Sequence, residues 1–324
     1  MRLNRFIPGE TSFGLAATVI VVLTGLVASA CVGGSSSARD ARGDQADGAP
    51  MTLRVVVSTT VIEDWVAHVG GDAVKVISLV PRGADAHTLQ LTPHDIIDLV
   101  DADLIVLNGA GLEAGFREVV EENTEAPLLD LAAELELDAG AGDGQDSSAG
   151  VDPHYWLDAG HAITALDLIA AMLGRRAPSL AIDFSKNAAA YADLIAIADE
   201  EIALSLRGLP EAQRTLVTFH DAFGYFARRY DLEIIGFVVE GPEEEPSADD
   251  IADLVASMRQ REVQVIFTEP QFSARVVEQV ADETDSAIGI LHSQLSEDAP
   301  TYLALLRANA AALTDPLTDP ADRE

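Results

Sequence analysis

The chain has one cysteine, Cys31, and few basic residues. A single cysteine cannot form an internal disulfide, so the fold does not depend on one. Lys and Arg number 20 against 54 Asp and Glu, and the formal net charge of the 324 residues is −34. Such a surface repels phosphate backbones and anionic lipid headgroups, which excludes nucleic acid as a partner class. It also concentrates cations, although an acidic composition is only a weak indication of a cation ligand.

Long apolar runs are also missing, except for one at the N-terminus. Arg2 and Arg5 precede an apolar stretch from about Phe13 to Val27, which is followed by small residues. A basic start, an apolar segment and a small-residue cleavage site predict a secretory signal peptide over residues 1–30. Gly and Thr interrupt the run, which argues against a permanent membrane span.

Cys31 stands where a bacterial lipoprotein carries its lipidated residue. The stretch Ala28-Ser29-Ala30-Cys31 resembles a lipobox, with Ala28 where Leu is more common. The alternative is an ordinary signal peptide with an incidental cysteine. We favour lipidation because residues 31–50 are rich in Gly, Ser, Ala and Asp, as in a flexible tether. The sequence therefore predicts an extracytoplasmic protein anchored by lipid to the bacterial cell membrane.

From Met51 onward, short apolar runs alternate with amphipathic segments. The pattern predicts strands at residues 53–58, 74–79, 104–107, 215–219, 232–239 and 263–267, and helices at 61–69, 93–100, 222–230 and 247–259. This alternation is typical of parallel sheets with helices on both faces. A helical pattern from Ile163 to Leu206, broken at Pro178, separates two such regions.

The predicted fold class is α/β with two lobes, each a mainly parallel sheet with flanking helices, joined by one long helix. We expect an N-terminal lobe over residues 51–179, a linking helix over 180–210 and a C-terminal lobe over 211–324. Residues 137–150 contain Gly, Asp and Ser, and are predicted to form a surface loop. Its aspartates suit either a weak attraction for cations or an acidic loop without a binding role, which we favour.

Four of the seven histidines stand at joints between predicted elements. His220 ends a predicted strand, whereas His87 and His292 follow apolar strand-like runs, and His154 lies in a polar turn. Ligands of open parallel sheets bind beyond the carboxyl ends of the strands, so these side chains can converge on one cleft. Imidazole suits tetrahedral Zn²⁺. However, local zinc motifs space their ligands a few residues apart, and these four lie roughly seventy residues apart. From the residues alone, isolated hydrogen-bonded histidines remain the favoured interpretation.

Longer motifs around the histidines resemble a known family. They are Gly83-Ala84-Asp85-Ala86-His87-Thr88, Asn108-Gly109-Ala110-Gly111-Leu112-Glu113, Asp152-Pro153-His154-Tyr155-Trp156-Leu157-Asp158, Phe219-His220-Asp221-Ala222-Phe223-Gly224-Tyr225-Phe226, Glu245-Pro246-Ser247, Phe267-Thr268-Glu269-Pro270-Gln271 and the segment from Thr301 to Asn309. In this order, over nearly the whole chain after the signal, they resemble the metal-binding lipoproteins of bacterial zinc and manganese ABC importers, of the zinc type. The resemblance implies a rigid linking helix and capture of Zn²⁺ in the interlobe cleft for delivery to an ABC permease and its ATPase.

The resemblance also implies which residues bind the ion. It places the first three metal ligands on His87, His154 and His220, where His at the third position is similar to the zinc members. The fourth position is normally Asp or water, and here His292 either completes an all-nitrogen site, which we favour, or is a bystander. Candidates to hydrogen-bond the ligating imidazoles, with capping as the alternative role, are Asp85, Asp152, Asp158, Asp221 and Glu269. We interpret His68, His94 and His161 as ordinary helix residues.

Other functions stay open at this point. The same fold can bind Mn²⁺ or Fe²⁺, or act as an adhesin. A zinc hydrolase would need an open metal position and a general base. The sequence has no His-Glu-x-x-His, Gly-x-Ser-x-Gly or P-loop motif. We therefore expect a monomeric binding protein without catalytic residues.

Overall fold

The computed structural model describes residues 52–137, 150–242 and 244–314, and all of them belong to one unit, Pro50–Glu324. The predicted signal peptide, Cys31, the tether and most of the predicted loop at 137–150 lie outside the described residues. Within the described part of the chain, no helix combines the length and the apolar character that a membrane span requires.

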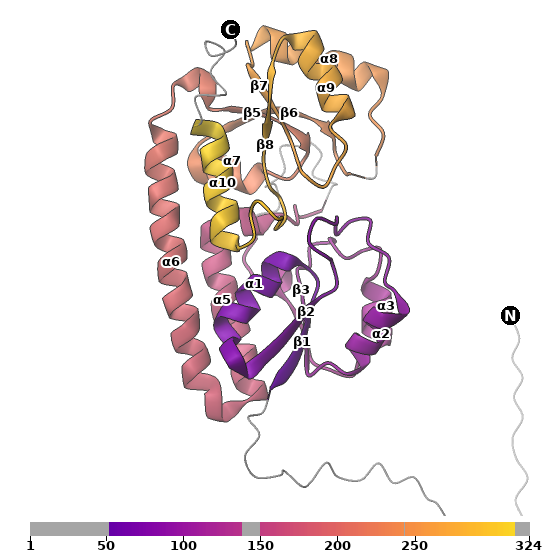
Figure 1. The fold of residues 1–324 in the computed structure, drawn as a ribbon, viewed down its shortest axis with the longest axis vertical. Helices are drawn as coiled ribbons and strands as arrows, with labels where there is room; N and C mark the ends of the chain where they lie inside the picture. Colours follow the sequence, from indigo (N-terminus) through magenta and orange to yellow (C-terminus); the bar gives the residue numbers. More distant parts are fainter. Residues whose placement is uncertain (1–51, 138–149, 243, 315–324) are drawn as a thin grey trace, which may run out of the picture. The chain divides into compact units, whose positions relative to one another are not determined.

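The first sheet has four parallel strands in the order β2-β1-β3-β4 (Figure 1). Side chains of β1 alternate between two apolar clusters: Val55 and Val57 face α1 and α5, whereas Val56 faces α2 and α3. Both faces of this sheet are therefore covered, as expected for parallel strands. Its strands are β1 (Leu53–Val57), β2 (Val74–Ser78), β3 (Leu104–Leu107) and β4 (Leu128–Asp130), and its helices are α1 (Thr60–Gly70), α2 (Pro93–Val100), α3 (Arg117–Glu122) and α4 (Leu131–Glu134).

The second sheet repeats the arrangement, with four parallel strands in the order β6-β5-β7-β8. Val217 of β5 packs toward α8 and α9, whereas its neighbour Leu216 packs toward α7 and α10. The strands are β5 (Thr215–His220), β6 (Glu233–Val239), β7 (Val265–Thr268) and β8 (Ala287–Ile290), and the helices are α7 (Gly224–Tyr230), α8 (Ala248–Gln260), α9 (Arg275–Thr284) and α10 (Tyr302–Thr314).

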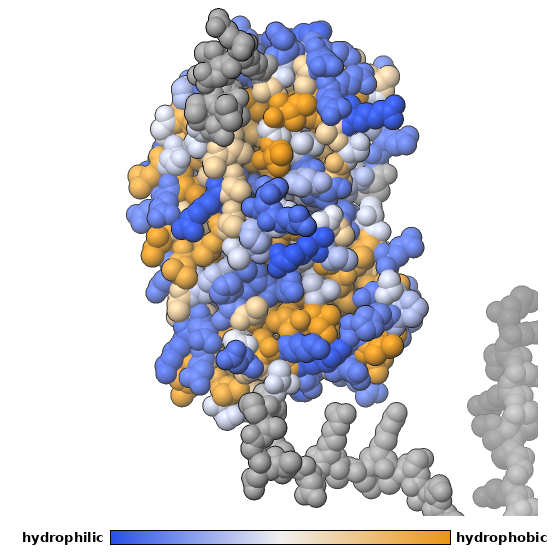
Figure 2. Space-filling model, in the orientation of Figure 1, coloured by the Kyte–Doolittle hydropathy of each residue, from blue (hydrophilic) through white to orange (hydrophobic). Residues whose placement is uncertain are grey.

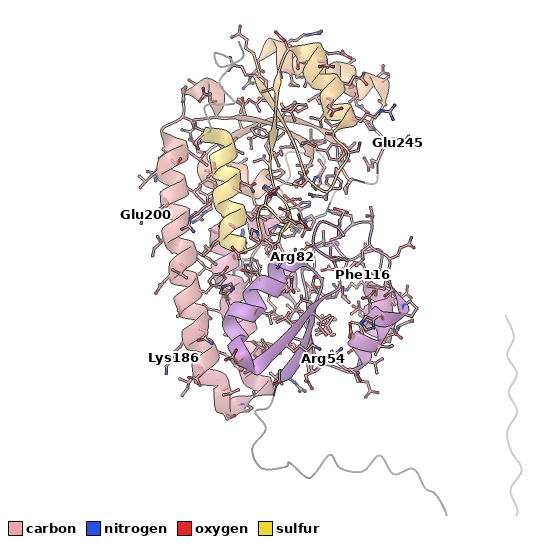
Figure 3. All side chains as sticks on the ribbon, viewed as in Figure 1. Arg54, Arg82, Phe116, Lys186, Glu200 and Glu245 are labelled. Atoms are coloured by element: carbon pink, nitrogen blue, oxygen red, sulfur yellow. The ribbon has the colours of Figure 1, made fainter. Side chains whose placement is uncertain are left out.

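Two long helices lie between the sheets in the sequence, α5 (Ala159–Arg176) and α6 (Ala181–Arg207). A short turn at Pro178–Leu180 separates them, since proline has no N–H for a continuing helix. Figure 1 shows α6 running alongside both sheets, and Lys186 and Glu200 project away from the body in Figure 3. The predicted fold class, two parallel-sheet α/β lobes with a long connecting helix, is confirmed.

Polar contacts hold α6 to both lobes. On one side, Tyr191 donates its hydroxyl hydrogen to Asp64 of α1 at 2.5 Å. On the other, the guanidinium of Arg229 in α7 binds Asp199 of α6 and also lies 3.0 Å from Asp158. Arg229 thereby joins the second lobe, the linking helix and the start of α5.

One apolar cluster runs through both lobes and the linking helix. It contains Trp65 of α1 and Tyr302 of α10, whose rings meet edge to face with centroids 5.3 Å apart. The outer surface mixes hydrophilic residues with separate hydrophobic patches (Figure 2), and Ile182, Leu194, Ile197 and Leu204 of α6 are exposed. Burial across both lobes explains why the described residues behave as one unit.

Helix starts follow the capping chemistry of the sequence. Thr92 and Asp95 form a reciprocal capping box at the start of α2, with Pro93 as its first residue. Ser247 and Asp250 form another at the start of α8. Five elements were not among those predicted, namely β4, α3, α4, α9 and α10. The first three span only three to six residues, which are too few to show a period.

Candidate metal site

His220 is the last residue of β5, and its side chain is only 2% exposed. Its Nδ1 lies 2.5 Å from Oε1 of Glu269, which directly follows the neighbouring strand β7. A carboxylate accepts, so Nδ1 carries a proton, and in the neutral ring the lone pair of Nε2 is available to bind an ion. The ends of two adjacent parallel strands thus orient this ring.

His154 stands before a short 3₁₀ turn, Tyr155–Leu157, and is buried. Asp152 Oδ1 accepts from the backbone N–H of His154 at 2.9 Å and lies 2.8 Å from its Nδ1. Asn108, which follows β3, donates to the carbonyl of Pro153 at 3.0 Å. The turn is therefore attached to the end of β3, with Nε2 of His154 directed away from Asp152.

His87 lies in the loop after β2 and is half-buried. Asp85 Oδ1 accepts from the backbone N–H groups of His87 at 2.8 Å and Thr88 at 3.2 Å. Asp85 therefore shapes the loop through the backbone N–H groups of His87 and Thr88.

The three rings meet at one point. Nε2 of His154 lies 3.3 Å from Nε2 of His87 and 3.4 Å from Nε2 of His220. One ligand nitrogen from each residue lies within 4.8 Å of the others. In a tetrahedral zinc site with Zn–N of about 2.0–2.1 Å, two nitrogens are about 3.3–3.4 Å apart. The two distances from Nε2 of His154 match that separation.

Electrostatics keep His87 neutral. Burial and the neighbouring His154 and His220 lower the pKa of His87 to about 3.

Burial alone would also lower the pKa of His220, but the charge and hydrogen bond of Glu269 outweigh it and raise that pKa. Burial raises the pKa of Asp85, against the opposing effect of His220. A neutral imidazole is the form that binds a metal.

The structure does not bring His292 into this group. Among the residues described, the cluster of potential metal-binding side chains comprises His87, His154 and His220. His292 is buried beside α10, where its backbone N–H donates to Asn309 Oδ1 at 2.7 Å. Its Nδ1 lies 3.1 Å from Ser296 Oγ. Its role as a ligand stays a prediction that the geometry of the three other rings does not require.

The five predicted hydrogen-bonding partners have different roles. Asp152 and Glu269 contact ligand imidazoles directly, whereas Asp158 caps α5 through Gly160 and pairs with Arg229. Asp221 contributes to the raised pKa of His220. The other histidines lie outside the group of three: His68 stacks on Tyr191, His94 is exposed, and His161 contacts Tyr155 and Tyr225.

Sequence reasoning missed two residues beside the site. Gln271 donates to Glu269 Oε2 at 3.0 Å and to Ser293 Oγ at 2.9 Å, and the Ser293 hydroxyl donates to Glu269. Neither residue type signals a role by itself. Gln271 does end the motif that begins at Phe267, and both residues follow a strand that ends at this edge of the sheet.

Known proteins resemble this chain in sequence and in fold. The family described as zinc-uptake complex component A, periplasmic, matches residues 55–315. The substrate-binding lipoprotein FimA of a metal ABC transporter in Streptococcus parasanguinis is 30% identical over 277 residues, covering 84% of this chain and 86% of FimA. The manganese-binding lipoprotein MntA of Bacillus subtilis (strain 168) is 29% identical over 293 residues, covering 86% and 93% of the two chains.

A solved structure gives the same result. The periplasmic zinc-binding protein TroA of Treponema pallidum superposes with a TM-score of 0.75 at 27% identity, covering 81% of this chain and 98% of that one. These proteins are substrate-binding transport components and not enzymes, so the prediction of a chain without catalytic activity is confirmed. Since the family match spans most of both lobes, this chain belongs to the ZnuA family of metal-binding, substrate-binding components of ABC importers.

Proposed function

We propose that this protein captures Zn²⁺ outside the cytoplasmic membrane through His87, His154 and His220, and delivers it to its ABC permease and ATPase. The observation that supports zinc most directly is the group of three imidazole nitrogens. Nitrogen donors suit Zn²⁺, whereas Mn²⁺ prefers oxygen, and no carboxylate belongs to this group within the described chain. TroA, named for zinc, has the same fold.

Three protein ligands leave one coordination position for water or for a further side chain. Such a site can release its ion, because the ligands come from different lobes, and a small displacement of His87 removes one of them. The half-buried loop of His87 is the least enclosed of the three positions. Capture and release then need no chemical step.

The test is equilibrium competition on metal-free protein, with Zn²⁺, Mn²⁺ and Fe²⁺ each titrated against a chelator of known affinity. We expect Zn²⁺ to bind most tightly, and each of His87→Ala, His154→Ala and His220→Ala to weaken it by more than about 100-fold, beyond the range for outer partners. His94→Ala is the matched control, because its side chain is 81% exposed and it should bind as the parent does. If all four variants bound Zn²⁺ as tightly as the parent protein does, the assignment of the site would be wrong.

Metal removal gives a second readout. A ligand that binds only the folded state at 100 times its Kd adds about 2.7 kcal/mol of stability. For a chain of this size that raises Tm by roughly 5–10 °C. We expect Zn²⁺ to raise Tm, excess chelator to reverse it, and the three alanine variants to show no rise.

The alternative is the same fold carrying Mn²⁺ or Fe²⁺. It is favoured by MntA, a relative named for manganese. Mn²⁺ binding stronger than Zn²⁺ binding in the competition experiment would establish that alternative. An adhesin role has no comparable support in the site.

Our proposals for the N-terminal segments and for the boundaries of the lobes rest on the sequence. Residues 1–30 act as a signal peptide, and residues 31–50 tether the lobes to a lipidated Cys31. Residues 51–179, 180–210 and 211–324 then serve as the first lobe, the linking helix and the second lobe of a monomeric carrier. FimA and MntA carry the word lipoprotein in their names, which supports the anchor.

A further inference from the structure

Trp156 packs directly against one of the three site histidines. Its ring meets that of His154 with centroids 5.2 Å apart and an interplanar angle of 63°. Trp156 is 1% exposed, so its ring cannot move away without opening the core. The position of Trp156 therefore limits where the His154 ring can lie.

Two residues of the second lobe hold Trp156. Its indole N–H donates to the backbone carbonyl of Ser293 at 2.8 Å, and its own carbonyl accepts from the hydroxyl of Tyr302 at 2.6 Å. Ser293 lies three residues after the end of β8, whereas Trp156 precedes α5. The support of His154 thus extends across to the lobe that carries His220.

The side chain of the same serine supports His220. Its hydroxyl donates to Oε2 of Glu269 and accepts from Gln271 Nε2 at 2.9 Å. Glu269 in turn accepts from Nδ1 of His220. Ser293 and Glu269 are buried, so water does not replace these hydrogen bonds.

We propose that Ser293 is a positioning residue that couples the two imidazoles: its carbonyl holds the tryptophan beside His154, and its hydroxyl holds the carboxylate that orients His220. A displacement of Ser293 moves both supports together. The distance of 3.4 Å between Nε2 of His154 and Nε2 of His220 depends on this one residue. The inference rests on the proposed function, since metal affinity is its readout.

The experiment compares Zn²⁺ affinity in the full chain and in Ser293→Ala, Trp156→Phe and the double variant. Loss of a group that hydrogen-bonds a ligating imidazole costs about 10–100-fold in metal affinity. Ser293 acts one hydrogen bond further out, through Glu269, so we expect a loss near the lower end of that range, about tenfold, from Ser293→Ala. Because both residues act on one arrangement, Trp156→Phe should cost less in the Ser293→Ala background than alone. Ser293→Thr, which keeps the hydroxyl, should restore most of the affinity.

Ser286→Ala is the matched control for a merely structural effect. Ser286 is also buried, and its hydroxyl donates to the carbonyl of Val263 at 3.0 Å, at the opposite end of β8. We expect it to lower the Tm of the metal-free protein without changing Zn²⁺ affinity more than twofold. The visible spectrum of the Co²⁺-loaded protein should change in Ser293→Ala and stay unchanged in Ser286→Ala.

The outcomes separate the two proposals. A parent chain that binds no Zn²⁺ overturns the proposed function. A parent that binds Zn²⁺, with a Ser293→Ala variant that matches it in affinity and Co²⁺ spectrum, overturns the role of Ser293 alone. Strictly additive losses in the double variant overturn the coupling.

Discussion

Glu269 and His220 form a buried pair, with Oε1 of the carboxylate 2.5 Å from Nδ1 of the imidazole. Each residue stands at the carboxyl end of one of two adjacent parallel strands, β7 and β5. The pairing of the strands therefore fixes the pairing of the side chains. Nε2 of His220 is left directed toward the other two rings.

Replacing Glu269 with Gln tests what the charge of this pair contributes. An amide oxygen can still accept from Nδ1 of His220, so ring orientation is kept while the negative charge is lost. We expect Zn²⁺ affinity to fall about 10–100-fold, measured by chelator competition. Glu278→Gln, an exposed change on α9, is the control and should have no effect. Unchanged affinity in Glu269→Gln would show that the charge is not needed.

His292→Ala tests the fourth predicted ligand. Because the ring is not part of the group of three, we expect its loss to weaken Zn²⁺ binding by less than about tenfold, below the usual range for outer partners. Competition titration beside His154→Ala provides the comparison. A loss as large as that of His154→Ala would make His292 a ligand and would require its ring to move toward the site.

The stability of the contact between α1 and α6 should depend on pH through His68. Its hydrogen bond to Asp64 raises the pKa of His68, and burial opposes the rise. The imidazole of His68 therefore holds its proton more tightly in the folded chain than in the unfolded chain, where its pKa is about 6.5. The stabilisation is fully present below that pH and is lost as pH rises through the higher folded pKa.

The measurement is urea unfolding of the parent and His68→Gln at pH 5.5 and at pH 8.5. The side chain is 43% exposed, so we expect a difference of only a few tenths of a kcal/mol between the two pH values. His94→Gln, at an exposed position on α2, serves as the control. A parent–variant difference that is the same at both pH values would contradict the prediction.

Cys31→Ala tests the lipid anchor predicted from the sequence. Without the thiol no acyl chain can be attached, so the protein should move from the membrane fraction to the soluble extracytoplasmic fraction. Fractionation followed by mass spectrometry of the N-terminal peptide measures both effects. An unmodified Cys31 in the parent would leave an ordinary signal peptide as the correct interpretation.

Much of the fold follows from local patterns in the sequence. The predicted helix at residues 93–100 coincides with α2, because a Thr–Pro start and a capping box mark its beginning. Strands such as 104–107 are continuous apolar runs, which is what burial on both faces requires. The hydrophobic period of a segment and the capping residues at its ends depend on residues nearby in the sequence, so they can be recognised without a structure.

The site could be predicted only in part. Motifs around His87, His154 and His220 identified the residues through resemblance, whereas their spacing along the chain gave no sign that they meet. The contact of Glu269 with His220, which an alternative capping role had left open, depends on which strands are neighbours in the sheet.

Residue types and their local order thus indicate an α/β chain with histidines at the ends of its elements, and they predict its export. Convergence of three rings, the separate position of His292 and the bridging role of Ser293 come from long-range packing. Strand order and the burial of Trp156 bring together groups that lie 66 to 137 residues apart in the chain. No local pattern carries that information, because each such contact depends on the arrangement of all the elements between its two ends.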